Sequence, residues 1–226
     1  MTIKNNAIFI ADAHYNSFRK DLLGVLKSIQ KKEIEVSQIF LMGDIFDFIC
    51  GEVDYFQNIN YSIIDIINEL SSEIETIYFE GNHDYNLKKI FPKINVIPRE
   101  VQPTYAKLNE QNVALAHGDI FTPTGYNIYC KVIRNSFLLT FLNLINLNGW
   151  LSKIIVDKLA QKKICHPMDN FLEFVQKRVN LYNSDLVIEG HFHQGYQDSK
   201  YINVPSLACS NQYMVYVDNQ FKFIKV

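Results

Sequence analysis

The chain has 226 residues, of which 48% are hydrophobic and 20% charged, and its formal net charge is −2. These values are ordinary for a globular protein with one sizeable core, and no stretch reaches the roughly 18 apolar residues that a membrane span needs. The first apolar run stops at Asp12 and is too short for a secretory signal, so we expect one cytoplasmic domain over residues 1–226.

Five short apolar runs are predicted to be buried strands, because each is rich in Ile, Val or aromatic residues. They cover residues 8–11, 39–42, 77–79, 113–116 and 186–188. Helical spacing predicts a helix after the N-cap candidates Asn16 and Ser17, and another over Ile59–Leu70. A hairpin turn is expected at Asp218 and Asn219, within a final group of strands at 201–204, 214–217 and 221–224. This alternation predicts a mixed α/β fold.

The segment 122–182 is predicted to be a helical insertion, with apolar residues at three- and four-residue steps and a break at Asn148 and Gly149. Within it, Phe137–Leu147 is apolar on more than one face, so this stretch either packs between helices or faces a lipid or membrane. The segment has eight lysine and arginine residues against three acidic ones. Such a balance favours an anionic partner, although solvated helix faces would give the same pattern.

The four cysteines are scattered along the chain and include no CxxC pair. We expect them to be reduced thiols that pack as small apolar side chains. They are Cys50, Cys130, Cys165 and Cys209.

Each of the five apolar runs is followed by a short motif of acidic, amide or imidazole side chains, and side chains at the carboxyl ends of strands in open α/β sheets gather ligands. Oxygen and imidazole groups bind hard and borderline divalent cations, and the single carboxylate of Asp44 has two oxygens that could bridge two ions. Cysteine is absent from the motifs, which argues against a structural zinc. The sequence therefore predicts a two-metal site that activates water and holds a phosphate. His166 lies outside the motifs, and we expect a surface or structural role for it. The motifs are Asp12-Ala13-His14, Gly43-Asp44-Ile45-Phe46-Asp47, Gly81-Asn82-His83-Asp84, His117-Gly118-Asp119 and Gly190-His191-Phe192-His193.

In this order the motifs resemble those of the calcineurin-like metallophosphoesterases, across nearly the whole chain. The resemblance implies two mixed β-sheets that pack face to face and are flanked by helices, with a helical cap insertion at about 122–182. By the same resemblance, His83 and Asp84 would serve catalysis, with His83 facing the leaving group or the phosphate as a candidate proton donor. Asp47, Asp84 and Asp119 would fix imidazoles or motif loops. One metal would be held by Asp12, His14, Asp44 and His193, and the other by Asp44, Asn82, His117 and His191.

The insertion further resembles the cap of UDP-2,3-diacylglucosamine pyrophosphatases of lipid A biosynthesis. This implies a manganese-dependent hydrolysis of a lipid-linked nucleotide sugar to UMP and 2,3-diacylglucosamine 1-phosphate, with water attacking the α-phosphorus. Tyr126 and Lys163 would contact the substrate, and the protein could touch the cytoplasmic face of the inner membrane. The oligomeric state stays open. Many members of that family have Arg where His83 stands, Glu where Asp47 stands, and Arg-Pro in place of Gln194-Gly195.

Three alternatives are left open. The first is a metallophosphodiesterase or phosphatase with a soluble nucleotide substrate. Such an enzyme would not need an apolar cap. Branches of that kind usually have Arg-Gly after the position of Asp47, where this chain has Phe48-Ile49. The second is a non-catalytic scaffold that has lost its metals. The presence of all seven expected ligands argues against this alternative. Nucleic-acid binding is the weakest alternative, because the basic segment has no recognisable motif, and we expect no nucleic-acid partner.

Overall fold

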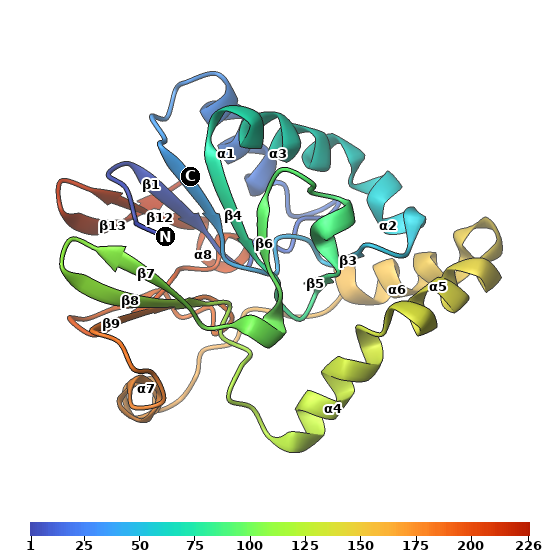
Figure 1. The fold of residues 1–226 in the computed structure, drawn as a ribbon. Helices are drawn as coiled ribbons and strands as arrows, with labels where there is room; N and C mark the ends of the chain where they lie inside the picture. Colours follow the sequence, from blue (N-terminus) through green and yellow to red (C-terminus); the bar gives the residue numbers. More distant parts are fainter.

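Two β-sheets packed face to face form the centre of the computed structural model, which describes residues 1–226 (Figure 1). The larger sheet has the strand order β13-β12-β1-β2-β4-β6, and the smaller has the order β10-β11-β9-β8-β7. The larger sheet comprises β1 (Ala7–Ile10), β2 (Gln38–Leu41), β4 (Glu75–Phe79), β6 (Asn95–Ile97), β12 (Gln212–Val217) and β13 (Gln220–Lys225). The smaller comprises β7 (Thr104–Leu108), β8 (Gln111–Ala116), β9 (Leu186–Glu189), β10 (Tyr196–Gln197) and β11 (Tyr201–Asn203), while β3 (Ile49–Cys50) pairs with β5 (Asp84–Tyr85).

Helices cover the outer faces of both sheets, so that the molecule has four layers (Figure 1). In β1, Ile8 and Ile10 face α1 and α3, whereas Ala7 and Phe9 face the other sheet, as the alternation of side chains along a strand requires. The helices are α1 (Asp21–Gln30), α2 (Asp54–Ile59), α3 (Tyr61–Glu73), α4 (Thr124–Ile133), α5 (Ser136–Ile145), α6 (Trp150–Ala160), α7 (Phe171–Val179) and α8 (Leu207–Ser210). Short 3-10 turns lie at Leu87–Lys89, Arg99–Val101 and Leu147–Gly149.

The mixed α/β fold expected from the sequence is confirmed, and each of the predicted strands is present within two residues of its expected bounds. The hairpin turn joins β12 to β13, with positive φ at both Asp218 and Asn219. The expected start of the first helix is wrong, because α1 begins at Asp21. The side chain of Asn16 instead accepts hydrogen bonds from the backbone N–H groups of Phe18 and Arg19, and its amide donates to Asp47.

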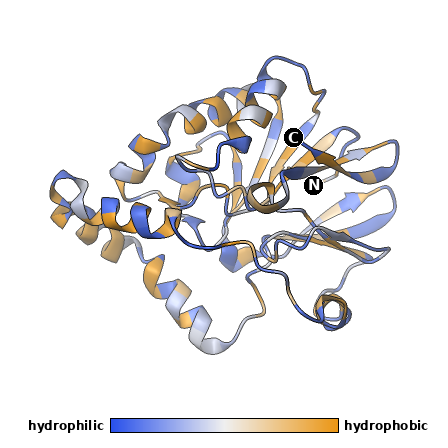
Figure 2. Ribbon diagram, turned by 180° about the vertical axis from the view of Figure 1, so that it is seen from behind, coloured by the Kyte–Doolittle hydropathy of each residue, from blue (hydrophilic) through white to orange (hydrophobic).

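The segment 122–182 contains α4 to α7, and the first three of these helices project from the body as an arm, which we define as residues 124–160 (Figures 1 and 2). Leu139 of α5 is buried against Phe56 of α2 and Tyr85 of β5. Most other apolar side chains of α5 are exposed, among them Phe137 at 88% and Leu144 at 71%. By length and composition none of the helices could cross a membrane alone, whereas α4 and α5 together could, with a 48° bend between them.

Candidate metal centre

The five motifs come together at the carboxyl ends of five strands, three of them in the larger sheet and two in the smaller. Strands β1, β2 and β4 are parallel, and so are β8 and β9, so their motifs emerge on the same side of each sheet. Asp12 and His14 follow β1, Asp44 follows β2, Asn82 and His83 follow β4, His117 follows β8, and His191 and His193 follow β9.

Two groups of side chains could each hold a metal ion, and Asp44 lies between them. Its Oδ1 is 3.6 Å from His117 Nε2, and its Oδ2 is 3.9 Å from His14 Nε2. One group joins Asp12, His14 and His193, and the other joins Asp44, His117 and His191. The arrangement is therefore compatible with a carboxylate that offers one oxygen to each of two ions.

The remaining expected ligand and a neighbouring histidine also face this space. Asn82 Oδ1 lies 3.4 Å from His117 Nε2, so it belongs to the second group. The nitrogens of His83 lie close enough to His14 and Asp44 to form a third possible cluster. His83 Nδ1 is engaged, because it donates a hydrogen bond of 2.6 Å to the Asp47 carbonyl, which leaves Nε2 as its free nitrogen.

Several buried polar atoms in the first group have no hydrogen-bond partner. They are Oδ1 of Asp12 and both ring nitrogens of His14. Asp12 Oδ1 is 3.2 Å from His193 Nε2, at the centre of the group. Buried polar atoms are rarely left unpaired in native proteins, and a cation would satisfy these. The donor set, which combines carboxylates, an amide and imidazoles, thus fits divalent metal ions.

The hydrogen bonds behind the imidazoles orient them toward the same space. His117 Nδ1 donates to the Met42 carbonyl at 2.8 Å, and His193 Nδ1 donates to the Ile164 carbonyl at 3.1 Å. In both residues this leaves Nε2 to face the carboxylates. A hydrogen bond to the far ring nitrogen is the usual way in which proteins fix the tautomer of a metal-binding histidine.

The backbone takes unusual conformations at this site. Five of the expected ligands have left-handed φ angles between 41° and 64°, which residues other than glycine seldom adopt. A side chain at Gly43 would overlap His117 Nδ1, and one at Gly81 would overlap Asp44 Oδ1, so both positions need glycine. The five residues are Asp12, His14, Asp44, His191 and His193.

The charges of the site shift the pKa values of its histidines in opposite directions. Burial opposes protonation of His117, but the carboxylates of Asp44 and Asp12 outweigh it and raise its pKa to about 9. Burial, together with repulsion from His117, lowers the pKa of His191 to about 4. Although burial works against ionisation of Asp44, the surrounding histidines hold the pKa of its carboxyl well below the usual range.

The three further acidic residues of the motifs contact different partners. Asp84 accepts hydrogen bonds from Tyr78 and from the backbone N–H groups of Asp44, Ile45 and Gly81, and so joins two motif loops. Asp47 lies 3.6 Å from His14 Nδ1 and pairs with Arg19. Asp119 pairs with Arg99.

Three buried arginines that the motifs gave no reason to single out hold the site loops. Arg99 binds Asp119, and Arg178 donates to the Gly118 carbonyl while pairing with Glu189. Arg134, at the end of α4, pairs with Glu80 and donates to the Gly81 carbonyl. Arg134 and Arg178 are therefore not available to an anionic partner, so these two residues of segment 122–182 give no support to that expectation. A glutamate at the carboxyl end of a buried strand was the available signal, because Glu80 directly follows β4 and Glu189 is the last residue of β9.

Of the two further residues expected to contact a substrate, Lys163 lines the cleft at the metal centre and Tyr126 does not. Lys163 and His166 line a cleft of about 200 Å³ together with His14, Asp44 and His83. Tyr126 does not line this cleft; its ring lies 5.7 Å from the guanidinium carbon of Arg99, and its role stays a prediction.

The expectation that all four cysteines are free thiols is wrong, because Cys165 and Cys209 form a disulfide. They lie 44 residues apart in the chain, and folding brings their Cα atoms to 5.5 Å. No local sequence pattern predicts this disulfide. Cys50 and Cys130 are free and buried, as expected.

Comparison with known proteins gives a family match and several similar proteins. The model of the calcineurin-like phosphoesterase family matches residues 6–195, a range that contains all five motifs. The UDP-2,3-diacylglucosamine hydrolase of Vibrio atlanticus is 25% identical over 199 residues, which cover 82% of this chain and 80% of that protein. The protein of the same name from Neisseria gonorrhoeae is 24% identical over 204 residues, which cover 82% and 81%. Among solved structures, Yfce, a phosphoesterase from E. coli, is 13% identical with a TM-score of 0.49, and the match covers 97% of this chain and 92% of that one.

Proposed function

Because the chain belongs to the calcineurin-like phosphoesterase family, we propose that it is a manganese-dependent hydrolase of the pyrophosphate bond in UDP-2,3-diacylglucosamine. The products would be UMP and 2,3-diacylglucosamine 1-phosphate, and the reaction would serve lipid A biosynthesis. The observation that carries the hydrolytic part is the convergence of the two ligand groups on Asp44. Relatives named for this substrate, matched over about four fifths of both chains, support the choice of substrate.

We assign the first ion to Asp12, His14, Asp44 and His193, and the second to Asp44, Asn82, His117 and His191. When bound, a pair of divalent ions supplies an activated water and stabilises charge on the phosphate oxygens. With both ring nitrogens protonated, His83 would donate the Nε2 proton to the leaving oxygen and become neutral, while its Nδ1–H stays bonded to the Asp47 carbonyl. Lys163, on the rim of the cleft, would contact a phosphate oxygen.

A partly apolar groove beside the site supports a substrate with acyl chains. The groove has a volume of about 390 Å³ and lies between α6 and the body. Phe48, Tyr55, Val156 and Leu159 belong to its apolar lining, whereas Asn16, Lys20 and Asp47 are among its polar lining residues. It adjoins the metal centre through Asp47, which lines the groove and lies 3.6 Å from His14. Each CH₂ group buried there would contribute about 0.8 kcal/mol to binding.

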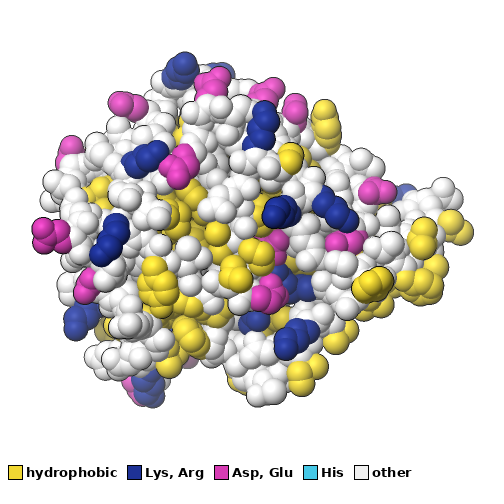
Figure 3. Space-filling view, in the orientation of Figure 1, with side chains coloured by type: hydrophobic (Ala, Val, Ile, Leu, Met, Phe, Trp, Pro, Cys, Tyr) yellow, Lys and Arg dark blue, Asp and Glu magenta, His cyan; other side chains and the backbone are white.

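The arm supports contact with a lipid surface, where such a substrate would reside. Apolar side chains gather on the projecting part of the molecule (Figure 3). Exposed lysines, among them Lys131 and Lys153, lie on the same helices. A helix with apolar and basic side chains suits the boundary between lipid headgroups and acyl chains, so we propose peripheral binding at the cytoplasmic face of the inner membrane.

The experiment that tests this function is incubation of the purified protein, loaded with Mn²⁺, with UDP-2,3-diacylglucosamine. We expect release of UMP and of the diacyl sugar phosphate in equal amounts. Hydrolysis of soluble nucleotides without cleavage of the lipid would instead favour the soluble-substrate alternative. No hydrolysis of either by metal-loaded protein would favour a scaffold.

Leu159→Gln tests the acyl groove. We expect a loss in kcat/KM of about tenfold for the diacyl substrate and little change for bis(p-nitrophenyl) phosphate, since only the former fills the groove. Ile154→Gln, on the same helix but outside the groove lining, is the matched control. Equal losses on both substrates would mean that the substitution misfolds the arm.

A further inference from the structure

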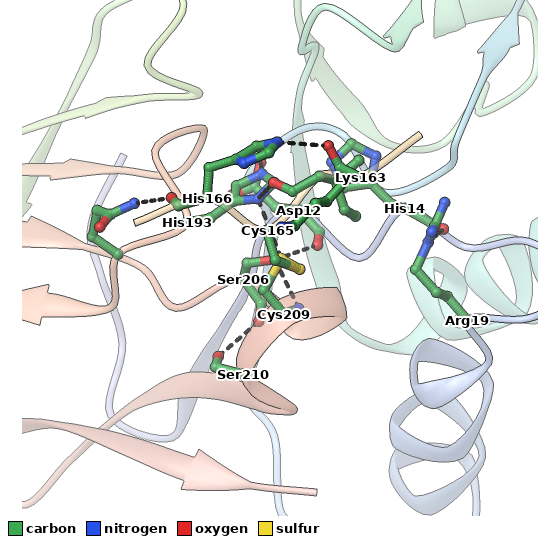
Figure 4. The surroundings of a disulfide bond; sticks show 12 residues. Asp12, His14, Arg19, Lys163, Cys165, His166, His193, Ser206, Cys209 and Ser210 are labelled. Carbon is green, nitrogen blue, oxygen red and sulfur yellow. Dashed lines mark hydrogen bonds and ion pairs between the residues drawn. A yellow bond between two sulfur atoms is a disulfide. The ribbon is translucent and has the colours of Figure 1, made fainter. Parts of the chain in front are cut away.

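The disulfide between Cys165 and Cys209 lies beside the metal centre, and neither cysteine belongs to one of the five motifs. We call residues 161–170, which connect α6 to α7, the linker. Cys165 in the linker is exposed, whereas Cys209 in α8 is half-buried. Figure 4 shows the disulfide next to Asp12 and His193, with Lys163 and His166 on the same side. The disulfide therefore joins an exposed residue, Cys165, to a residue whose sulfur lies 3.5 Å from the expected ligand His193.

The linker contacts the metal centre through the last motif. The Ile164 carbonyl accepts the hydrogen bond from His193 Nδ1, at 3.1 Å. Gln194 binds the linker twice, since its amide donates to the His166 carbonyl at 3.0 Å and its oxygen accepts from Met168 N at 3.1 Å. The linker thus supplies the partner that orients one expected ligand, and it carries Lys163 at the rim of the cleft.

The other half of the disulfide is tied to a second ligand of the same group. Ser206, the N-cap of α8, donates its hydroxyl to the Asp12 carbonyl at 2.9 Å, and accepts from Cys209 N at 3.2 Å. Cys209 Sγ is 3.5 Å from His193 Nδ1. The disulfide consequently connects the linker to the structure around both Asp12 and His193.

Few other forces hold the linker in place. Of the residues between 161 and 170, only Ile164 is half-buried, and the others are exposed. Such a segment gains little from apolar burial, so its position depends on the three hydrogen bonds to His193 and Gln194 and on the covalent bond. Breaking the covalent bond should therefore let it move.

We propose that Cys165 and Cys209 are a redox-active pair that controls the metal centre: the disulfide form holds the linker against His193, and the dithiol form releases it. The inference rests on the proposed metal-dependent hydrolysis, but not on the lipid substrate. The reductant is a dithiol. One of its sulfurs attacks the exposed Cys165 sulfur, forming a mixed disulfide while the Cys209 sulfur leaves and takes a proton from solvent.

The second sulfur of the dithiol then attacks the mixed disulfide and releases Cys165 as a thiol. The protein disulfide has gained two electrons and two protons, and the reductant has become a cyclic disulfide. Afterwards the Cys209 sulfur remains beside His193 Nδ1, where it competes with the Ile164 carbonyl for the ring N–H. This exchange of hydrogen-bond partner changes the orientation of the metal-binding nitrogen of His193. It also changes the position of Lys163.

The experiment compares the same wild-type protein in two forms, oxidised with glutathione disulfide or reduced with dithiothreitol that is then removed under argon. Peptide mapping verifies the state of the pair. Titration with Mn²⁺ followed by electron paramagnetic resonance should show affinity about tenfold weaker in the reduced form, the scale expected when a metal ligand loses its hydrogen-bond partner. Hydrolysis of bis(p-nitrophenyl) phosphate should fall by a similar factor. Trypsin should cleave faster after Lys162 and Lys163 in the reduced form, which reports linker release without any metal.

Variants separate the pair from the other thiols. The double variant Cys165→Ser with Cys209→Ser should have the Mn²⁺ affinity of the reduced wild type, and dithiothreitol should not change it. The double variant Cys50→Ala with Cys130→Ala should show the same change in Mn²⁺ affinity on reduction as the wild type. Equal Mn²⁺ affinity and equal cleavage by trypsin in the two wild-type forms would overturn the proposal, and so would the absence of a Cys165–Cys209 bond after oxidation. If the lipid substrate is not cleaved but the two forms still differ in Mn²⁺ affinity, the substrate assignment fails and the redox control stands.

Discussion

Asp44 connects the two halves of the candidate site. Its Oδ1 faces His117 and its Oδ2 faces His14, while the backbone N–H of His83 donates to Oδ1 at 2.9 Å. The residue is buried and has a left-handed backbone conformation. A strained residue that carries a buried charge costs folding free energy, and such residues cluster at functional sites.

Asp44→Asn is the substitution that most specifically removes the shared carboxylate. The amide has a similar shape but only one oxygen and no negative charge, so we expect fewer than two Mn²⁺ ions per chain and a fall in hydrolysis of more than about 100-fold. Elemental analysis and a phosphodiesterase assay measure both. Two retained ions and ordinary activity would be incompatible with the bridging assignment.

His83→Ala distinguishes a proton donor from a metal ligand. Because Nδ1 of His83 is bound to the Asp47 carbonyl and Nε2 faces the cleft, we expect turnover to fall by about 10²- to 10⁴-fold. The metal content should stay near that of the unaltered protein. Loss of an ion on elemental analysis would assign His83 to the third cluster instead.

The raised pKa of His117 predicts how metal binding depends on pH. In the metal-free protein this histidine holds a proton up to about pH 9, and it must lose the proton to bind an ion. Mn²⁺ affinity should therefore rise with pH by up to about tenfold per unit for one displaced proton, and level off near pH 9. Calorimetric titration in buffers of different ionisation enthalpy measures the released proton. An affinity that does not change between pH 6.5 and 9 would be inconsistent with this explanation.

The raised pKa of His117 also makes the free energy of unfolding of the metal-free protein fall as the pH rises, whereas Mn²⁺ affinity increases. A pKa raised from 6.5 to about 9 adds stability that is fully present below pH 6.5 and is lost as the pH rises through about 9. Metal-free protein should thus unfold more easily at alkaline pH, whereas the loaded protein should not lose this contribution.

At the scale of elements, the buried pair of Arg134 and Glu80 connects the arm to the loop that carries Asn82. Arg134 directly follows α4 as its C-cap residue, and its guanidinium donates to the Gly81 carbonyl at 3.0 Å. The Asn86 side chain in turn donates to the Arg134 carbonyl at 3.0 Å. The arm and the loop of the third motif are therefore held together by polar contacts around the buried ion pair of Arg134 and Glu80.

Arg134→Met should destabilise the protein by about 3 kcal/mol, because it leaves Glu80 buried without its partner. Burial already raises the pKa of Glu80, so the carboxyl would take up a proton, which keeps the cost at the lower end of the range for broken buried pairs. Urea unfolding measures the change. Lys131→Met, at an exposed position of the same helix, is the control and should change stability by no more than about 0.5 kcal/mol. A loss below about 1 kcal/mol for Arg134→Met would show that the pair is dispensable.

The elements that the sequence predicted well are those set by local patterns. Strands such as β2 and β9 are continuous apolar runs, and the turn at Asp218 and Asn219 has the residue types that favour positive φ. The start of α1 was misplaced because the polar side chain of Asn16 has a second use, which is to hold Asp47. That use depends on a residue 31 positions away, which no local pattern contains.

At the scale of the whole molecule, the arrangement of two sheets explains why motifs far apart in the chain meet. The inner core is built from alternate residues of both sheets, so the carboxyl ends of β1, β2 and β4 lie against those of β8 and β9. Which residues follow these strands could be predicted from the sequence. The contacts of Arg178 with Glu189, and the disulfide, could not, because they join segments whose proximity depends on the complete fold.

The exposed apolar arm predicts binding to lipid vesicles. The double variant Phe137→Ser with Leu144→Ser should bind phosphatidylglycerol vesicles at least about tenfold more weakly, since each apolar side chain contributes about 1.5–3 kcal/mol when buried. Sedimentation with the vesicles measures this affinity. Tyr105→Ser, an exposed aromatic position on β7, is the control and should bind as the unaltered protein does. Unchanged binding by the double variant would exclude the arm as the contact surface.

The central claim, that folding assembles a two-metal hydrolytic site around Asp44, is tested most directly by anomalous diffraction at the manganese edge from crystals soaked in Mn²⁺. We predict two peaks about 3.5–4 Å apart, both within bonding distance of Asp44. One peak should adjoin Asp12, His14 and His193, and the other should adjoin Asn82, His117 and His191. No peak at this position, or a single ion that Asp44 does not contact, would contradict the account.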